Sequence, residues 1–229
     1  FVRDPVQRLY SEYQHFLRDG RFKGEFREFF SHRHRINQLG KYLDLVPVEA
    51  LGVVGLTERY EESLEIINSR YGISLNPLAE NTARPKLDQD YGISKEDRRE
   101  LERLNQRDIW LYRRALYAFE TRYSLFKKGL RFAHCQLTDI SPRRIAGWAF
   151  WEGGTDEPVT VLVRVNGDIV RECFATLFRH TMCSWGVARS GYIGVACGAK
   201  LQPGDQGDCI VKETGQVFPH RPKTLPSAK

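Results

Sequence analysis

The sequence predicts a mostly helical α/β domain over residues 1–129, followed by a small all-β sandwich over residues 130–229. Three observations support this fold class. Apolar residues recur at helical spacing through most of the first part. A valine- and glycine-rich apolar run at 51–56 is typical of a buried strand. From about residue 131 apolar and polar residues alternate with the period of a strand. A chain of 229 residues is long enough for both domains.

In the first part, Asp4 precedes Pro5 and predicts a helix N-cap with proline at the first helical position. One apolar face then extends to Gly20, where we expect this helix to end. A second helix is predicted over residues 33–42. The strand at 51–56 runs directly into Thr57, which is a good N-cap residue.

The helix that follows Thr57 is expected to end at Gly72, because glycine is common just past a helix C-terminus. Proline and glycine predict a loop over 73–93. Ser94 with Asp97 predicts the cap of a further helix, and residues 105–128 read as a long amphipathic helix ended by Gly129.

The second part is predicted to contain strands at 145–149 and 159–165. Asn166 and Gly167 lie between apolar runs, which is a strong signal for a type I′ hairpin turn. Glycines separate further short apolar segments, as in a β-sandwich. We therefore place the domain boundary between residues 129 and 130.

Composition narrows the classes of partner. The net charge is +6 and the excess is shared evenly between the two parts, with no polybasic block. A nucleic-acid-binding protein usually concentrates its charge on one element, so we expect small anionic ligands and no nucleic acid. The longest apolar stretch, near residues 45–56, is interrupted by Pro47 and Glu49, so no transmembrane segment is predicted.

The five cysteines are odd in number and form no CxxC pair, which favours a reducing compartment. We therefore expect a cytoplasmic location, either free or associated with a membrane. A zinc site can be drawn from one histidine and three cysteines, but the spacing matches no common zinc module, and no metal is predicted. These four residues are His180, Cys183, Cys197 and Cys209.

The residues at the start of the chain offer a binding site. Arg3 is expected at the carboxyl end of a strand and beside a helix N-terminus, where α/β proteins bind ligands and anions. Its planar guanidinium suits a phosphate, and Ser11, two helical turns on, can donate to the same oxygens. The alternative is that Arg3 pairs with Asp4 or Glu12 while Ser11 faces water.

The segment FVRDPVQRLYSEY resembles the 3′-phosphate-binding segment of sulfotransferases that use 3′-phosphoadenosine-5′-phosphosulfate (PAPS). The resemblance implies that Arg3 and Ser11 hold the 3′-phosphate of this donor. VVGLTERYEESLEII and LNQRDIWLYRRALYAF resemble later segments of the carbohydrate-type, bacterial or membrane-associated branch, in the same order. The match covers roughly residues 1–129 and implies part of a P-loop-like fold.

The sequence departs from this family in one respect. In the family, the loop that grips the 5′-phosphosulfate lies N-terminal to the matching segment, as the catalytic base often does, and neither is found in these residues. We therefore expect half of a donor site here, and little activity from this chain alone. The implied reaction moves a sulfuryl group from PAPS to a hydroxyl or amine of an acceptor, commonly a carbohydrate, without a metal. A nucleotide kinase is disfavoured because no G-x-x-x-x-G-K-[ST] loop occurs.

Weaker site candidates follow. His32 and His34 suggest a catalytic base, but positions i and i+2 of a helix point to nearly opposite sides, so exposure to solvent is the favoured interpretation. Asn37 and Gln38 are candidates for substrate binding. Two residues of the loop, Arg84 and Lys86, are candidates for the donor phosphates or are solvated charges.

The second part resembles accessory β-sandwich modules of glycan-modifying enzymes. Trp148, Trp151 and Trp185 can stack on sugar rings, although most tryptophans of small sandwiches belong to the core. The alternative function for the whole chain is therefore a non-catalytic module that binds a glycan or a protein partner.

Overall fold

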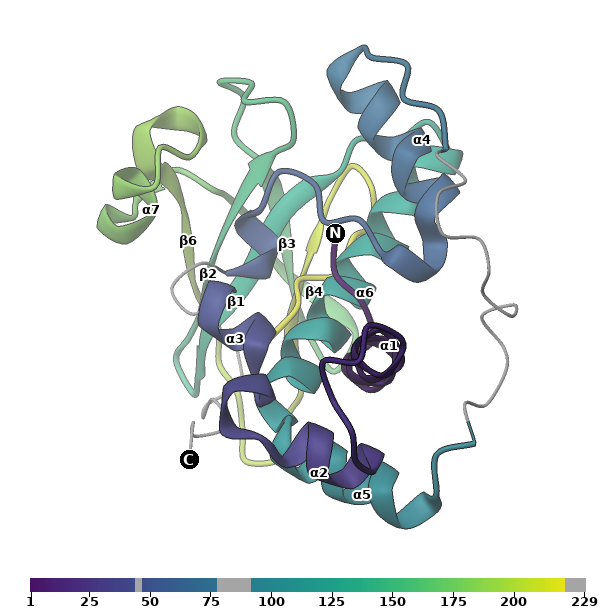
Figure 1. The fold of residues 1–229 in the computed structure, drawn as a ribbon. Helices are drawn as coiled ribbons and strands as arrows, with labels where there is room; N and C mark the ends of the chain where they lie inside the picture. The colour runs from purple at the N-terminus through teal and green to yellow at the C-terminus, as the bar shows by residue number, and fades with distance from the viewer. Residues whose placement is uncertain (44–46, 78–91, 221–229) are drawn as a thin grey trace. The chain divides into compact units, whose positions relative to one another are not determined.

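The structure is a computed structural model that describes residues 1–43, 47–77 and 92–220 (Figure 1). The chain divides into two compact units, one formed by residues 1–119 and the other by the described residues from Glu120 on. The division falls within the long helix α6 (Gln106–Lys127), whereas the sequence suggested a boundary after this helix. Each unit is described by itself.

The first unit is an assembly of helices. Val6, Leu9, Phe30 and Leu101 share one buried cluster, so the first, second and fifth helices pack together. Across both units, helices account for 43% of the described residues. The helices besides α6 are α1 (Pro5–Arg18), α2 (Phe26–Ser31), α3 (Gln38–Leu43), α4 (Tyr60–Tyr71) and α5 (Lys95–Leu104), with 3-10 turns η1 (Arg33–Arg35), η2 (Val48–Ala50) and η3 (Thr57–Arg59).

Three of the predicted helix ends are confirmed. The Asp4 carboxylate accepts a hydrogen bond from the Gln7 amide at 2.9 Å, and the Ser94 hydroxyl accepts one from the Asp97 amide at 3.0 Å. Gly72 follows α4 with a left-handed φ of 63°, which glycine adopts without strain. The prediction for Thr57 is wrong, because its hydroxyl donates to the Val2 carbonyl and Thr57 itself begins η3.

The single helix predicted over residues 33–42 is also wrong. Asn37 has a left-handed φ of 51°, which interrupts the segment between η1 and α3. Asparagine tolerates this conformation better than most residues. The short helix α2, which the sequence analysis did not identify, precedes this segment and buries Phe29 and Phe30.

The strand predicted over 51–56 is reduced to one parallel bridge between Val2 and Leu56. Two hydrogen bonds hold it, from the Val2 amide to the Gly55 carbonyl and from the Thr57 amide to the Val2 carbonyl, both 2.9 Å. Each side of the bridge runs into helical structure, α1 after Val2 and η3 with α4 after Leu56. The parallel direction and the helical segments that follow resemble an α/β unit, but the pairing is limited to this one bridge.

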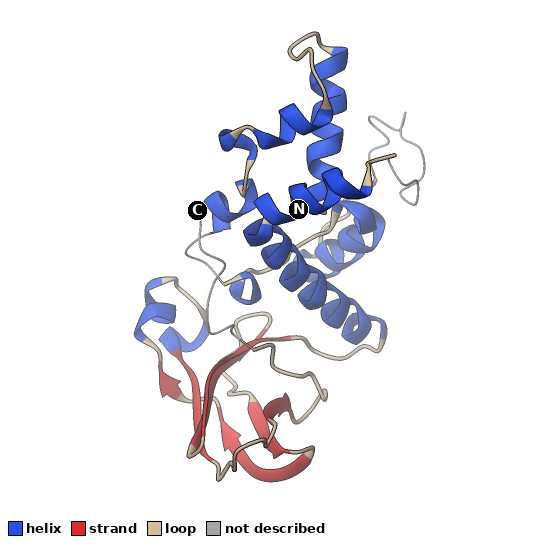
Figure 2. Ribbon diagram, turned by 90° about the horizontal axis from the view of Figure 1, so that it is seen from below, coloured by secondary structure: helices blue, strands red, loops and turns tan. Residues whose placement is uncertain are grey.

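The second unit contains two antiparallel sheets, as predicted, with strand orders β1-β2-β6-β5 and β4-β3-β7 (Figure 2). Trp151 and Val195 of the first sheet share one buried cluster with Val161 and Val211 of the second. The two sheets thus form a sandwich. The strands are β1 (Ala133–Ser141), β2 (Arg144–Trp151), β3 (Thr160–Val165), β4 (Asp168–Phe174), β5 (Leu177–Phe178), β6 (Tyr192–Gly198) and β7 (Gly207–Val211), and the short helices are α7 (His180–Ser184) and η4 (Ala188–Gly191).

The hairpin between β3 and β4 is confirmed. Asn166 has φ 53° and Gly167 has φ 91°, so both central residues are left-handed, as a type I′ turn requires. The turn is tied to the loop before β7, because the Asn166 side chain donates to Asp205 at 2.8 Å and accepts from the Gln206 amide at 2.9 Å.

The sequence predicted that all five cysteines are reduced, and two of them are not. Cys173 of β4 is joined to Cys197 of β6 by a disulfide, which links the two sheets. The expectation is therefore wrong for this pair, whose sheet positions the sequence does not reveal. Over the described ranges, no group of three or more histidine, cysteine or acidic residues is arranged to hold a metal ion. None of the described helices combines the length and the apolar character that crossing a membrane requires.

The free cysteines are expected to react very differently with iodoacetamide. Burial raises the pKa of the Cys209 thiol to about 12, so only about one molecule in ten thousand carries the reactive thiolate at pH 8. Cys183 is half-buried and accessible. Mass spectrometry of the native protein labelled at pH 8 should find the adduct on Cys183, with Cys209 labelled only after denaturation. Equal labelling rates would contradict the burial of Cys209.

Candidate functional site

The first unit holds a pocket of about 430 Å³ beside the N-terminus of α1. Residues from four separate segments line it: the start of the chain, α1, the stretch from η1 to α3, and α6. The lining residues are Phe1, Val2, Arg3, Pro5, Arg8, Glu12, His34, Arg35, Gln38, Leu39, Tyr42 and Asp108.

The parallel bridge determines where this pocket lies. Arg3 directly follows the bridge residue Val2 and immediately precedes the Asp4 cap of α1. The Asp4 amide donates to the Glu58 carboxylate at 2.6 Å, which fastens the start of α1 to the segment after Leu56. Arg3 and the first turn of α1 are therefore held next to a parallel bridge, a position that resembles the strand ends at which α/β proteins bind ligands.

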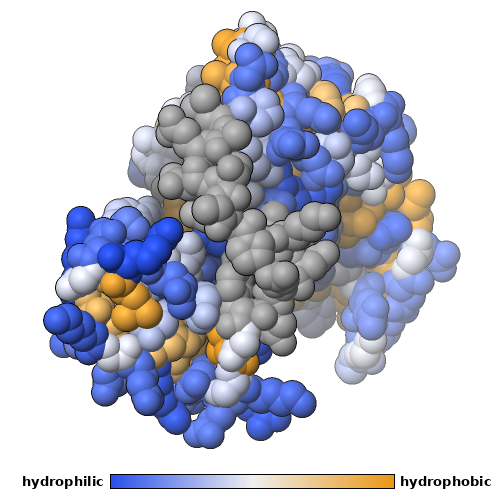
Figure 3. All heavy atoms as spheres, turned by 45° about the vertical axis from the view of Figure 1, so that its right-hand side comes forward, coloured by the Kyte–Doolittle hydropathy of each residue, from blue (hydrophilic) through white to orange (hydrophobic). Residues whose placement is uncertain are grey.

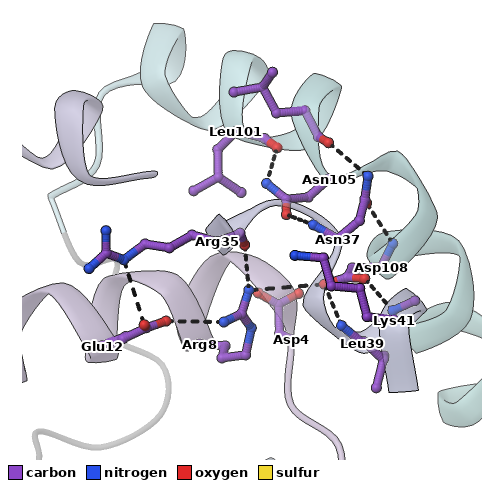
Figure 4. A network of polar contacts seen from close by, with 12 residues as sticks. Asp4, Arg8, Glu12, Arg35, Asn37, Leu39, Lys41, Leu101, Asn105 and Asp108 are labelled. Carbon is purple, nitrogen blue, oxygen red and sulfur yellow. Dashed lines mark hydrogen bonds and ion pairs between the residues drawn. The ribbon is translucent and has the colours of Figure 1, made fainter. Parts of the chain in front are cut away.

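Arg8 connects three walls of the pocket (Figure 4). Its guanidinium donates to Glu12 at 3.1 Å and to the Arg35 carbonyl at 3.3 Å. A third contact, 3.9 Å long, joins it to the Asp108 carboxylate. Arg8 thus links α1 to the η1 segment and to α6.

Arg35 is a buried cation, with 6% of its surface exposed. Its guanidinium carbon lies 3.6 Å from the centre of the Phe29 ring and 5.0 Å from that of Phe16, so it is held by two cation–π contacts. Its Nε atom makes no hydrogen bond and lies 3.6 Å from a Glu12 oxygen. Arg35 is thus a buried guanidinium in the pocket wall, paired with Glu12 and packed on two aromatic rings.

The far wall of the pocket is fastened to α6 by buried polar groups. Asp108 accepts hydrogen bonds from the Leu39 and Gly40 amides at 3.0 and 2.8 Å. Asn105 accepts one from the Asn37 amide at 2.9 Å. The residues just before and within α3 are thereby attached to the cap residue between α5 and α6 and to the first turn of α6 (Figure 4).

The electrostatic balance of the pocket is cationic. Arg3, Arg8, Arg35 and the ionisable His34 line it together with only two carboxylates. One of these, Asp108, directs both oxygens at backbone amides. Burial raises the pKa of Asp108, while hydrogen bonds from Gly40 and Leu39 and the charge of Arg8 oppose this shift. An anion in this pocket meets several fixed donors and little repulsion.

The structure brings together some of the residues that the sequence analysis singled out. Arg3, His34 and Gln38 line the pocket. Ser11, His32 and Asn37 are not among the lining residues, although Ser11 lies on the neighbouring helix α1. The Asn37 side-chain amide is engaged with the end of α5, donating to the Leu104 carbonyl at 3.2 Å. The candidates Arg84 and Lys86 lie outside the described residues.

The two histidines are exposed, as the favoured interpretation has it, but they do not point to opposite sides. Their ring centres are 5.5 Å apart. The expectation assumed an α-helix through both residues, whereas His32 has an extended backbone and His34 lies in the short turn η1. Only His34 lines the pocket.

Several pocket residues escaped the sequence analysis. Arg8 stands inside the R-D-P-x-x-R run and four residues before Glu12, a spacing that predicts an ion pair on one helix face. Asp108 stands in the segment that resembles the last helix of the sulfotransferases. The roles of Arg35 and Tyr42 carried no sequence signal, because they depend on the interruption at Asn37.

In the second unit, Trp148 and Trp151 are 3% and 1% exposed, so these two tryptophans are buried and cannot stack on a sugar. Trp185 is 38% exposed. Phe178 of β5 and Tyr192 of β6 are exposed too, with ring centres 5.2 Å apart. On the face of the molecule in Figure 3, hydrophilic residues cover most of the surface and apolar residues form small separate patches.

No family model matches the chain, and neither a curated protein nor a solved structure shows significant similarity to it.

Proposed function

We propose that residues 1–129 are part of a PAPS-dependent sulfotransferase domain and bind the donor nucleotide. The reaction of such a domain moves a sulfuryl group from PAPS to a hydroxyl or amine of an acceptor, and a carbohydrate is the acceptor class we propose. The observation that carries the proposal is the pocket beside the parallel bridge between Val2 and Leu56, lined by Arg3, Arg8 and Arg35.

The chemistry of sulfuryl transfer suits such a site. The enzyme has to hold donor and acceptor in line and stabilise the phosphate oxygens of the leaving nucleotide, which demands fixed cations more than covalent chemistry. The Arg3 guanidinium can hold a phosphate bidentately, and the N-terminus of the 14-residue helix α1 adds its positive dipole end. These residues are assigned to donor binding, and none of them is assigned as the catalytic base.

The sequence and the pocket support the proposal independently. The resemblance rests on the run from Phe1 to Tyr13, and in the structure this run forms one wall of the pocket. The resembling segments around Thr57 and Asp108 supply the Glu58 contact to Asp4 and the opposite wall. Two of the three segments that resemble the family thus line the pocket, and the third contacts Asp4 beside it.

Nuclear magnetic resonance with adenosine 3′,5′-bisphosphate tests the proposal. Titration into the isotope-labelled chain should shift the amide signals of Arg3, Arg8 and His34, while those of the β-sandwich strands stay in place. Shifts confined to the sandwich, or an unchanged spectrum at millimolar nucleotide, would overturn donor binding at this pocket.

A further inference from the structure

Asp108 is a fully buried carboxylate at the wall of the pocket. Its Oδ1 accepts from the Gly40 amide at 2.8 Å and its Oδ2 from the Leu39 amide at 3.0 Å. The same Oδ2 lies 3.9 Å from Nη2 of Arg8. One side chain of α6 therefore contacts the backbone of α3 and a cation of α1 at once.

The stretch entering α3 depends on these contacts. Asn37 has a left-handed backbone and attaches to both sides of the α5–α6 junction. Its backbone amide donates to the side chain of Asn105, the C-cap of α5, and its side-chain oxygen accepts from the Asp108 amide of α6 at 3.3 Å. Pocket-lining residues lie on either side of this attachment, His34 and Arg35 before it and Gln38 and Leu39 after it. A shift at Asn37 would displace both groups.

We propose that Asp108 is a positioning residue for the anion pocket: its carboxylate fixes the backbone at Leu39 and Gly40, and this position holds the wall opposite Arg3. This inference rests on the proposed function in one respect, because the nucleotide that probes the pocket is the ligand of that function. The negative charge of Asp108 opposes the binding of an anion, whereas its hydrogen bonds favour binding through geometry. The two effects have opposite signs and can be separated.

Glu12 provides the matched control. It also lies beside Arg8, at 3.1 Å, and also lines the pocket. Glu12 pairs with the side chains of Arg8 and Arg35, whereas Asp108 accepts from backbone amides. Glu12→Gln and Asp108→Asn therefore remove the same charge next to the same arginine. Only Asp108→Asn replaces a carboxylate oxygen that accepts a hydrogen bond from a backbone N–H with an NH₂ group, which cannot accept one.

Calorimetry with adenosine 3′,5′-bisphosphate should show opposite outcomes. Asp108→Asn is expected to weaken binding about ten-fold, because a buried amide of α3 loses its acceptor and the wall shifts. Glu12→Gln is expected to bind more tightly, because a repelling charge is lost from the pocket. Equal or tighter binding by Asp108→Asn would overturn the positioning role.

Amide hydrogen exchange supplies a readout that does not depend on the nucleotide. Asp108→Asn should speed exchange at Leu39 and Gly40 at least ten-fold relative to wild type, with exchange at Ile66 in α4 unchanged. Unchanged exchange at Leu39 and Gly40 would overturn the proposal even when nucleotide binding changes. If the wild-type chain binds no bisphosphate, the proposed function fails, while the exchange result still decides the role of Asp108.

Asn37→Gly covers the case in which Asp108→Asn does not fold. Glycine keeps the left-handed backbone, and the variant changes no charge while it removes the side-chain contacts with Leu104 of α5 and Asp108 of α6. Weaker nucleotide binding and faster exchange at Gly40 are expected. Wild-type behaviour in both measurements would contradict the claim that attachment to α6 positions this wall.

Discussion

Replacing Phe29 with alanine is expected to lower the free energy of unfolding of the helical unit by about 3–5 kcal/mol. Phe29 is fully buried, and its ring lies 5.2 to 5.5 Å from those of Tyr13, Phe16 and Phe22. The same ring supports the guanidinium of Arg35 at 3.6 Å. Truncation therefore leaves a cavity and removes one of the rings beside a buried cation. Urea unfolding followed by far-ultraviolet circular dichroism measures the loss.

Phe29→Leu is the matched control. Leucine retains much of the buried apolar volume but none of the π-face, so a smaller loss, about 1–1.5 kcal/mol, is expected. A loss below about 1 kcal/mol in the alanine variant would show that Phe29 does not support this core. Because Arg35 lines the pocket, Phe29→Ala should also weaken nucleotide binding under conditions in which it remains folded.

Replacing Arg3 with alanine is expected to weaken the binding of adenosine 3′,5′-bisphosphate at least ten-fold. A charge-assisted hydrogen bond to a phosphate contributes about 1.5–3 kcal/mol, and a ten-fold change in affinity corresponds to about 1.4 kcal/mol. Arg3→Lys should recover part of the loss, since lysine keeps the charge but not the bidentate fork. Isothermal titration calorimetry at fixed salt measures the affinities.

Arg18→Ala is the control for net charge. Arg18 is an exposed arginine in the last turn of α1, outside the pocket lining, so its removal changes the charge of the protein equally. Its effect on affinity is expected to be under two-fold. If Arg3→Ala and Arg18→Ala weaken binding by the same factor, Arg3 acts only through long-range charge and does not contact the phosphate.

Local signals in the sequence predicted much of the fold. The caps at Asp4 and Ser94 and the hairpin at Asn166 and Gly167 depend on residues close together in the chain, and each is found as predicted. Hydrogen bonds between residues a few positions apart determine such features, so periodicity and turn chemistry suffice to locate them.

Features that depend on distant residues were predicted less well. Thr57 resembles an N-cap, yet its hydroxyl is used by Val2, far away in the sequence. Asn37 resembles the interior of a helix, yet its backbone is left-handed and its amide donates to the side chain of Asn105, far away in the sequence. Cys173 and Cys197 carry no local sign that they face each other across the sandwich.

The residues of the candidate site also divide into those with a local signal in the sequence and those without one. Arg3 was predicted because it stands between a strand and a proline-primed helix, which is a local pattern. Arg35 and Asp108 were not, because their place at the pocket follows from how α2, α3 and α6 pack. The cationic character of the pocket was therefore predictable only in part, from the segment that carries the family resemblance.

The central claim is that this pocket recognises a 3′-phosphate, and a comparison of two nucleotides tests it most directly. Adenosine 3′,5′-bisphosphate and adenosine 5′-phosphate differ only in that group. Calorimetry on the wild-type chain should show the bisphosphate binding at least ten-fold more tightly. Equal affinities, or no binding of either nucleotide, would contradict the assignment of this unit to PAPS-dependent sulfuryl transfer.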